Sequence, residues 1–160
     1  MTCHRAENTD NPENLRQIIS AANKISQKIK IIFPLHPRTR KIIQKLKITL
    51  SENVIASQPL SYLNTIALEK NAYAILTDSG GMQKEAFFLG TPCITFREQT
   101  EWIETVQSGM NIITGANEKK IVSAFANFAN KRIKKPAIFP YGRGNSAEKI
   151  IKILIAKLKK

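Results

Sequence analysis

Short runs of Ile, Val and Leu alternate with longer amphipathic stretches along this 160-residue chain. A short apolar run between turn residues is typical of a buried strand, and apolar residues at helical spacing are typical of a helix packed on a sheet. The alternation predicts an α/β fold, a three-layer Rossmann-like domain in which helices cover a parallel sheet. Strands are predicted at 30–35, 53–57, 73–77, 92–96 and 111–114, and helices at 38–47, 59–69, 81–89, 101–106, 117–130 and 146–160.

The first helix carries the clearest local signals. Pro12 suits the first position of a helix, and Asn11 or Asp10 can cap it. Its predicted buried stripe consists of Leu15, Ile18, Ile19, Ala22 and Ile25. Near the other end, two prolines and two glycines predict a loop over 131–145 that leads into the last helix. We find no internal repeat and predict one domain over residues 1–160.

Several classes of protein are excluded by composition. The longest uncharged apolar stretch, 121–130, is far shorter than the roughly 20 residues that cross a bilayer, so no membrane segment is expected. Residues 1–14 have no apolar run and cannot act as a secretory signal, which predicts a cytoplasmic location. Cys3 and Cys93 form no metal-binding spacing, and no metal or cofactor is expected.

The net charge of +13 would suit a nucleic-acid binder, but most of it comes from one segment. Residues 118–160 hold twelve basic and two acidic side chains, and the rest of the chain is nearly neutral. In the helix predicted at 146–160, the apolar residues form one stripe and the lysines lie opposite. This pattern favours a solvated lysine face, and the helix has no aromatic residues for base stacking. Nucleic-acid binding therefore stays as an unlikely alternative.

One strand end has the pattern of an anion site. The strand predicted at 73–77 runs into Asp78, Ser79, Gly80 and Gly81, where a helix begins. Glycine amides at a helix N-terminus can hold a phosphate, the Ser79 hydroxyl can add a hydrogen bond, and Glu85 can accept hydrogen bonds from a ribose diol. The alternative is structural: Asp78 and Ser79 cap the helix, and the glycines make a tight turn.

A second polar cluster lies at residues 2–8, before the first helix, and is expected at the end of a strand that starts further upstream. It contains His4, Arg5 and Glu7. A single histidine is more often a surface or core residue than a catalytic one, and the same applies to His36.

Taken together, these motifs closely resemble the C-terminal half of the non-hydrolysing UDP-N-acetylglucosamine 2-epimerases. The shared motifs are His-Arg-x-Glu-Asn at 4–8, Thr-Asp-Ser-Gly-Gly-Met-Gln-Lys-Glu-Ala at 77–86, Leu-Gly-Thr-Pro at 89–92, Arg-Glu-Gln-Thr-Glu at 97–101 and Tyr-Gly-Arg-Gly at 141–144. The resemblance covers essentially the whole chain. It implies one half of a two-domain fold of the glycosyltransferase-B type, with a UDP-sugar bound between the halves.

In that family, UDP leaves UDP-N-acetylglucosamine by elimination and re-adds to give UDP-N-acetylmannosamine, a precursor of surface polysaccharides. The resemblance assigns His4 to assisting the departure of UDP, and Ser79, Gly80 and Gly81 to the phosphates. It assigns Glu85 to the ribose. Residues expected near the interdomain cleft, where bacterial members bind an activator, are Arg5, Glu7, His36 and Arg97.

Some positions differ from the best-known bacterial pattern. Lys84 and Trp102 replace a Glu and an Arg, and Leu60 and Thr65 replace residues near the uracil. The first two variants look like a subgroup that includes epimerases of UDP-2,3-diacetamido sugars, so the substrate stays open. The family's catalytic carboxylates lie in the N-terminal domain, so the chain is expected to need an N-terminal epimerase domain or subunit. A glycosyltransferase nucleotide domain is the other alternative.

Overall fold

The computed structural model describes residues 1–129, 140–142 and 144–158. All five predicted strands are present, each one to two residues shorter than predicted at one or both ends. They are β1 (Ile31–Pro34), β2 (Val54–Ser57), β3 (Ile75–Thr77), β4 (Cys93–Thr95) and β5 (Asn111–Ile113). Every strand pair is parallel, in the registers Ile31 with Val54, Ile75 with Cys93, and Cys93 with Asn111. The predicted parallel α/β fold is therefore confirmed.

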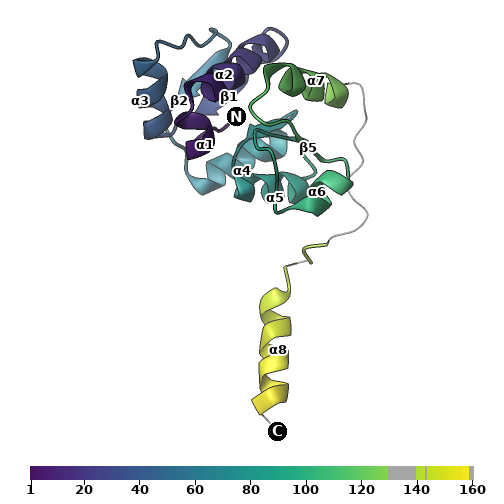
Figure 1. The fold of residues 1–160 in the computed structure, drawn as a ribbon. Helices are drawn as coiled ribbons and strands as arrows, with labels where there is room; N and C mark the ends of the chain where they lie inside the picture. The colour runs from purple at the N-terminus through teal and green to yellow at the C-terminus, as the bar shows by residue number, and fades with distance from the viewer. Residues whose placement is uncertain (130–139, 143, 159–160) are drawn as a thin grey trace.

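The predicted helices are present as well, with one addition. The long ones are α2 (Pro12–Ser26), α3 (Pro37–Lys45), α4 (Tyr62–Asn71), α5 (Gly80–Leu89), α7 (Glu118–Ala129) and α8 (Ser146–Leu158), and α6 (Ile103–Gln107) is short. The sequence analysis missed α1 (Ala6–Thr9), because four residues are too few for an apolar period. In Figure 1, α2 and α7 lie on one side of the β3 to β5 sheet, and α4, α5 and α6 lie on the other.

The strands form two sheets where the sequence predicts one. One sheet pairs β1 with β2, and the other has the order β3, β4, β5. Residues 1 and 2 lie between them: the Met1 amine donates to the Ile32 carbonyl at 2.7 Å, and the Thr2 amide donates to the Leu76 carbonyl at 2.9 Å. The N-terminal residues thus bridge the two sheets.

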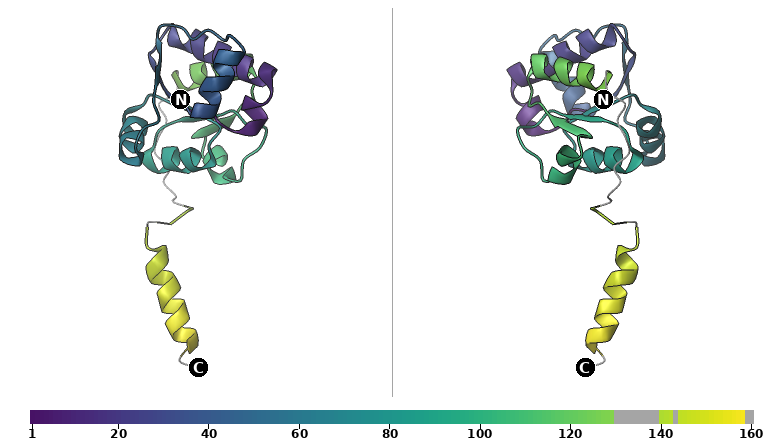
Figure 2. Two further views of the ribbon diagram at one scale, coloured as in Figure 1. Left: turned by 90° about the vertical axis from the view of Figure 1, so that its left-hand side faces the viewer. Right: turned by 90° about the vertical axis from the view of Figure 1, so that its right-hand side faces the viewer.

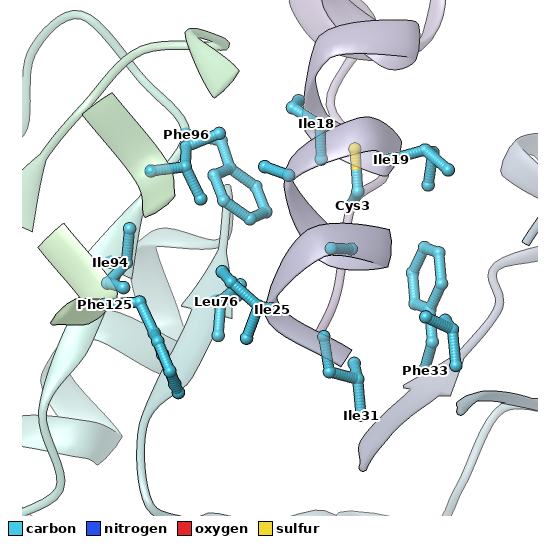
Figure 3. Packing of buried hydrophobic residues seen from close by; sticks show 14 of the residues in the cluster. Cys3, Ile18, Ile19, Ile25, Ile31, Phe33, Leu76, Ile94, Phe96 and Phe125 are labelled. Atoms are coloured by element: carbon cyan, nitrogen blue, oxygen red, sulfur yellow. The ribbon is translucent and has the colours of Figure 1, made fainter. Parts of the chain in front are cut away.

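The core is centred on α2. Asn11 accepts hydrogen bonds from the Glu13 and Asn14 amides, so the predicted cap is confirmed, and Pro12 occupies the first turn. The predicted stripe of α2 is fully buried. Figure 3 shows this helix between the two groups of strands, with Phe33 and Ile31 on one side and Ile94, Phe96 and Phe125 on the other. The buried face of α2 therefore packs against both sheets.

Helix α8 differs from the other helices because it does not pack on the core. It forms where predicted, but its apolar stripe is not covered: in the described part of the chain none of its residues is buried, and Figures 1 and 2 show it apart from the rest of the chain. Lys152 pairs with Glu148 one turn away. Most of the loop predicted at 131–145 lies outside the described residues. No described helix combines the length and the apolarity needed to span a lipid bilayer.

Candidate functional site

The turn after β3 forms the N-terminus of α5. Ser79 is the N-cap, and its hydroxyl accepts a hydrogen bond from the Met82 amide at 3.4 Å. The Ser79 amide in turn donates to the Thr77 hydroxyl at 2.9 Å. The structural alternative raised for this segment therefore holds for Ser79. A cap uses one of the free amides of a helix, and the other first-turn amides can still face an anion.

The two glycines of this turn differ in what surrounds them. Gly80 is buried, and a Cβ atom there would lie 2.5 Å from Oε1 of Glu101 and 3.4 Å from Nε1 of Trp102. Gly81 is exposed, and the nearest atom to a Cβ there would be the Ser79 hydroxyl at an ordinary 3.8 Å. A side chain at 80 would therefore displace the Glu101 carboxylate, whereas the space beside 81 is open. Close approach of a ligand is a reason for glycine at 81 that the rest of the chain does not supply.

Asp78 joins this turn to the N-terminal cluster. Its fully buried carboxylate accepts hydrogen bonds from the His4 amide at 2.9 and 3.1 Å and from the Arg5 amide at 2.9 Å. The side-chain amide of buried Asn8 donates to it as well, at 3.1 Å, and also donates to the Phe96 carbonyl at 3.0 Å. Asp78 is not the helix cap that the alternative proposed. It binds residues 4–8 to the glycine turn.

His4 lies at the edge of this arrangement. Its Nδ1 is 3.3 Å from Oδ1 of Asp78, and its side chain is 42% exposed. The ring of His36 lies 6.1 Å away between centroids. Nδ1 of His36 accepts a hydrogen bond from the Arg38 amide at 3.2 Å, so this side chain caps α3. The structure thus brings both histidines to the same end of the strands as the glycine turn.

The candidate cleft residues form an ion-pair network. The Arg97 side chain is 13% exposed and contacts Glu7 at 3.6 Å and Glu101 at 2.8 Å. A hydrogen bond from the Glu101 backbone amide and the Arg97 guanidinium together hold the pKa of the Glu101 carboxyl below its usual value. Arg5 is half-buried beside them. These charged groups lie next to Gly80, so an anion bound at the glycine turn would meet both acidic and basic side chains.

Two of the unusual positions contact each other. Lys84 Nζ lies 4.4 Å from the centre of the Trp102 ring and 5.2 Å from that of Tyr141, which is cation–π geometry. The Tyr141 hydroxyl donates to Oε2 of Glu104 at 2.7 Å, and together with burial this carboxylate raises the tyrosine pKa above its usual range. Tyr141 thus packs on α5 and α6, and Arg143 lies outside the described residues. Because the two side chains contact each other, we expect relatives that differ at position 84 to differ at position 102 as well.

A buried carboxyl group lies behind the site, on α4. Glu69 is 3% exposed, and neither of its carboxylate oxygens has a hydrogen-bond partner among the described residues. Burial raises its pKa to about 7, and the nearby Glu85 carboxylate adds to the shift. The Met1 amine, whose pKa burial lowers to about 6, is the positive group close to it, and the Cys93 thiol is also near. The sequence analysis missed Glu69, because a polar residue in an amphipathic helix is ordinarily placed on the solvent face.

We predict that Glu69→Gln removes part of the pH dependence of stability. Between about pH 4.5 and 7, the folded chain holds a proton on Glu69 that the unfolded chain has released, so this group lowers stability as pH rises. Relative to wild type, the free energy of unfolding of the variant should rise by about 2–3 kcal/mol across that range. Urea titrations at several pH values measure it. The exposed Glu52→Gln is the matched control, and equal slopes in all three proteins would contradict the prediction.

Among the described residues, no group of three or more His, Cys, Asp or Glu side chains could hold a metal ion. Asp78 was predicted only as a helix cap and Asn8 was given no role, yet these two residues orient the others. The available signal was their position, since an acidic residue directly after a buried strand is well placed to bind the backbone of the neighbouring strand end.

Comparison with known proteins gives a consistent set of relatives. A family model described as UDP-N-acetylglucosamine 2-epimerase matches residues 1–155. The chain is 48% identical over 157 residues to a UDP-N-acetylglucosamine 2-epimerase homolog of Methanococcus maripaludis, covering 96% of this chain and 43% of that protein. It is 44% identical over 158 residues to the UDP-2,3-diacetamido-2,3-dideoxy-D-glucuronate 2-epimerase of Pseudomonas aeruginosa, covering 98% and 44%.

A solved structure agrees with these sequences. The UDP-GlcNAc 2-epimerase of Methanocaldococcus jannaschii, in complex with UDP-GlcNAc and UDP, superposes with a TM-score of 0.87 at 42% identity. The match covers 97% of this chain and 44% of that one. The chain thus spans less than half the length of the relatives it matches.

Proposed function

Since the chain belongs to the UDP-N-acetylglucosamine 2-epimerase family, we propose that it is the UDP-binding C-terminal half of such an epimerase. In this proposal it binds the UDP part of a UDP-sugar and works with an N-terminal epimerase domain or subunit in the cytoplasm. By itself it is expected to bind nucleotide weakly and to catalyse nothing. The catalytic carboxylates that the resemblance implies belong to the other half.

The observation that carries the proposal is the Asp78 carboxylate and what it holds together. Through its hydrogen bonds to the His4 and Arg5 amides, it fixes the histidine motif beside the glycine turn. The exposed amide end of α5 can hold a phosphate, and the His4 ring lies 3.3 Å from the Asp78 carboxylate, one residue before the Ser79 cap of that helix. This is the pairing that departure of UDP needs, namely an anion site with a titratable side chain next to it.

His4 is proposed to assist the leaving group. Breaking the bond between the sugar and UDP leaves negative charge on the diphosphate, and an imidazolium within reach offsets that charge. Asp78 acts on His4 as a positioning residue, because it binds both the backbone amide and Nδ1 of the ring. Arg5, Glu7, His36 and Arg97 are proposed to face the interdomain cleft, where an activator would bind.

The sugar is proposed to be N-acetylglucosamine, converted to the manno epimer for surface polysaccharide synthesis. A UDP-2,3-diacetamido sugar is the second candidate, and one specific observation favours it. Lys84 and Trp102 pack together beside the glycine turn, and a relative 44% identical to this chain acts on such a sugar. Comparing turnover of the two sugar nucleotides by the complete enzyme would decide between them.

We predict that Gly81→Val abolishes UDP binding while the chain stays folded. The protein leaves room for a side chain at this position, so the valine would occupy space that a phosphate needs. Titration calorimetry with UDP measures the affinity, and thermal unfolding checks the fold. Leu63→Val is the matched control, because Leu63 is exposed at the same position of α4, two residues after its Ser61 cap. Affinity like that of wild type in Gly81→Val would refute the phosphate site.

We predict that Glu85→Gln weakens UDP but not 2′,3′-dideoxy-UDP. Glu85 is half-buried one and a half turns into α5, and its carboxylate is proposed to accept hydrogen bonds from the ribose hydroxyls. Each charge-assisted bond contributes about 1.5–3 kcal/mol, so affinity for UDP should fall at least tenfold. Calorimetry with both nucleotides measures this. An equal loss for both would mean that Glu85 only supports the local structure.

A further inference from the structure

A hydrogen-bond donor and a hydrogen-bond acceptor lie next to the same point beside Gly80. A Cβ atom on Gly80 would lie 2.5 Å from Oε1 of Glu101 and 3.4 Å from Nε1 of Trp102. The indole nitrogen of Trp102 is buried and has no hydrogen-bond partner among the described residues. Buried donors are nearly always paired in folded proteins. An unpaired donor at the edge of a candidate binding turn therefore needs an acceptor, which a ligand can supply.

The Glu101 carboxylate is the acceptor at this point. Its Oε2 accepts a hydrogen bond from Nη1 of Arg97 at 2.8 Å, while Oε1 is the oxygen that faces Gly80. Because the pKa of Glu101 lies below its usual value, the group is ionised at neutral pH and can only accept hydrogen bonds. The side chain is 46% exposed, so a ligand at the glycine turn can reach it.

The Trp102 ring is fixed before any ligand binds. The Trp102 backbone amide donates to the Thr100 hydroxyl at 3.1 Å, and this hydroxyl donates to Oε1 of the fully buried Gln83 at 2.6 Å. Nζ of Lys84 lies 4.4 Å from the centre of the ring, in cation–π geometry. A group that is already held in position loses little conformational freedom when it binds a ligand.

The chemistry of this pair selects among the parts of a UDP-sugar. A phosphate oxygen can accept from the Trp102 indole, but it cannot donate to Glu101 and is repelled by the carboxylate charge. A hydroxyl group both donates and accepts, so a single hydroxyl can bind both side chains at one point. The ribose hydroxyls are already assigned to Glu85 in the proposed function. The hydroxyls of the sugar remain.

We propose that Glu101 and Trp102 together bind one hydroxyl group of the sugar, and so help to select the substrate. The hydroxyl donates to Oε1 of Glu101 and accepts from the indole N–H of Trp102. This inference rests on the proposed function, because it takes the ligand of the glycine turn to be a UDP-sugar. In this arrangement the phosphates meet the amide end of α5, and the sugar lies beside Gly80.

Titration calorimetry of the 160-residue chain with UDP and with UDP-N-acetylglucosamine tests the proposal. Glu101→Gln and Trp102→Phe should each weaken binding of UDP-N-acetylglucosamine by about tenfold, the effect of losing one such hydrogen bond. Binding of UDP should change by less than about twofold, because UDP has no sugar hydroxyl for the pair. Trp102→Phe keeps an aromatic ring beside Lys84 and removes only the donor.

Glu98→Gln is the matched control. Glu98 is exposed, lies three residues before Glu101 in the chain, and has its Oε1 next to Gly115 and not next to Gly80. The control variant should bind both ligands like wild type. Thermal unfolding of all the variants checks that each is folded.

A second set of ligands identifies the hydroxyl. Analogues of UDP-N-acetylglucosamine that lack the 3-, 4- or 6-hydroxyl are titrated into wild type and into Glu101→Gln. One of the three analogues should bind wild type about tenfold more weakly than the parent compound does. Glu101→Gln should not weaken that analogue further, because the group that Glu101 binds is already gone.

Three results would overturn the proposal. Equal effects of the variants on UDP and UDP-N-acetylglucosamine, or no effect on either, would mean that the pair does not bind the sugar. Tighter binding of both ligands by Glu101→Gln would place a phosphate at this point. Sensitivity of all three analogues to Glu101→Gln would assign the pair to another group, such as the acetamido group. A folded wild-type chain that binds neither ligand would refute the proposed function, whereas intact UDP binding with a failed sugar test would refute this inference alone.

Discussion

Replacing Asp78 with alanine is expected to lower the free energy of unfolding by about 3–5 kcal/mol, the range typical of breaking a buried charged network. The carboxylate is fully buried and accepts hydrogen bonds from two backbone amides and the Asn8 side chain. Its removal takes the acceptor from the two part-buried backbone amides and from one of the two hydrogen bonds of the Asn8 side chain, and each unsatisfied group costs about 1–3 kcal/mol. Asp78→Asn keeps the shape and part of the acceptor capacity, so it should cost less.

The matched control for this prediction is Asp10→Ala. Asp10 also binds a positive group, the Arg38 guanidinium, but both side chains are about half exposed. Exposed ion pairs contribute about 0–1 kcal/mol, so this variant should be nearly as stable as wild type. Urea unfolding of the three variants measures the differences. A loss below about 1 kcal/mol in Asp78→Ala would mean that residues 4–8 are held by other contacts.

A structural feature could be predicted from the sequence where the residues that determine it lie close together along the chain. The stripe and cap of α2 were predicted correctly, because Pro12 and the apolar period act within one helix. The turn from β3 into α5 was predicted for the same reason. Asp78 was predicted to cap the helix because its neighbours in sequence suggested a cap, while its actual partners lie 70 to 74 residues away.

Two other features depended on long-range packing. The strands divide into two sheets, and this division depends on which strands pair in space, which no single segment reveals. The exposure of the apolar face of α8 could not be predicted from one segment either. The sequence predicts the apolar stripe, but none of the described residues covers it.

The proposed roles of His4, Ser79, Gly80, Gly81 and Glu85 stay predictions. The structure shows that His4 binds the carboxylate of Asp78, the residue directly before the Ser79 cap of α5. The cleft candidates are grouped as well, since Arg97 contacts Glu7. Their function depends on a ligand or a second domain, and only experiments with both can test it.

Epimerisation is expected to require a second polypeptide. Removing the proton at C2 of the sugar needs a positioned base, and general-base assistance is typically worth about 10²–10⁴-fold. The acidic residues near the glycine turn already have partners: Asp78 binds backbone amides, and Glu7 and Glu101 pair with Arg97. In the proposed function, the chain holds UDP and assists its departure, and the base is proposed to come from the N-terminal half.

The most direct test is exchange of the C2 proton of UDP-N-acetylglucosamine with deuterated water, followed by NMR. The 160-residue chain alone should show only background exchange. Addition of the N-terminal half of a related epimerase, mixed or fused before Met1, should raise the rate at least 10²-fold. His4→Ala should lower it again, and Glu52→Gln, an exposed residue remote from the site, should not. Rapid exchange by the purified chain alone would contradict the account.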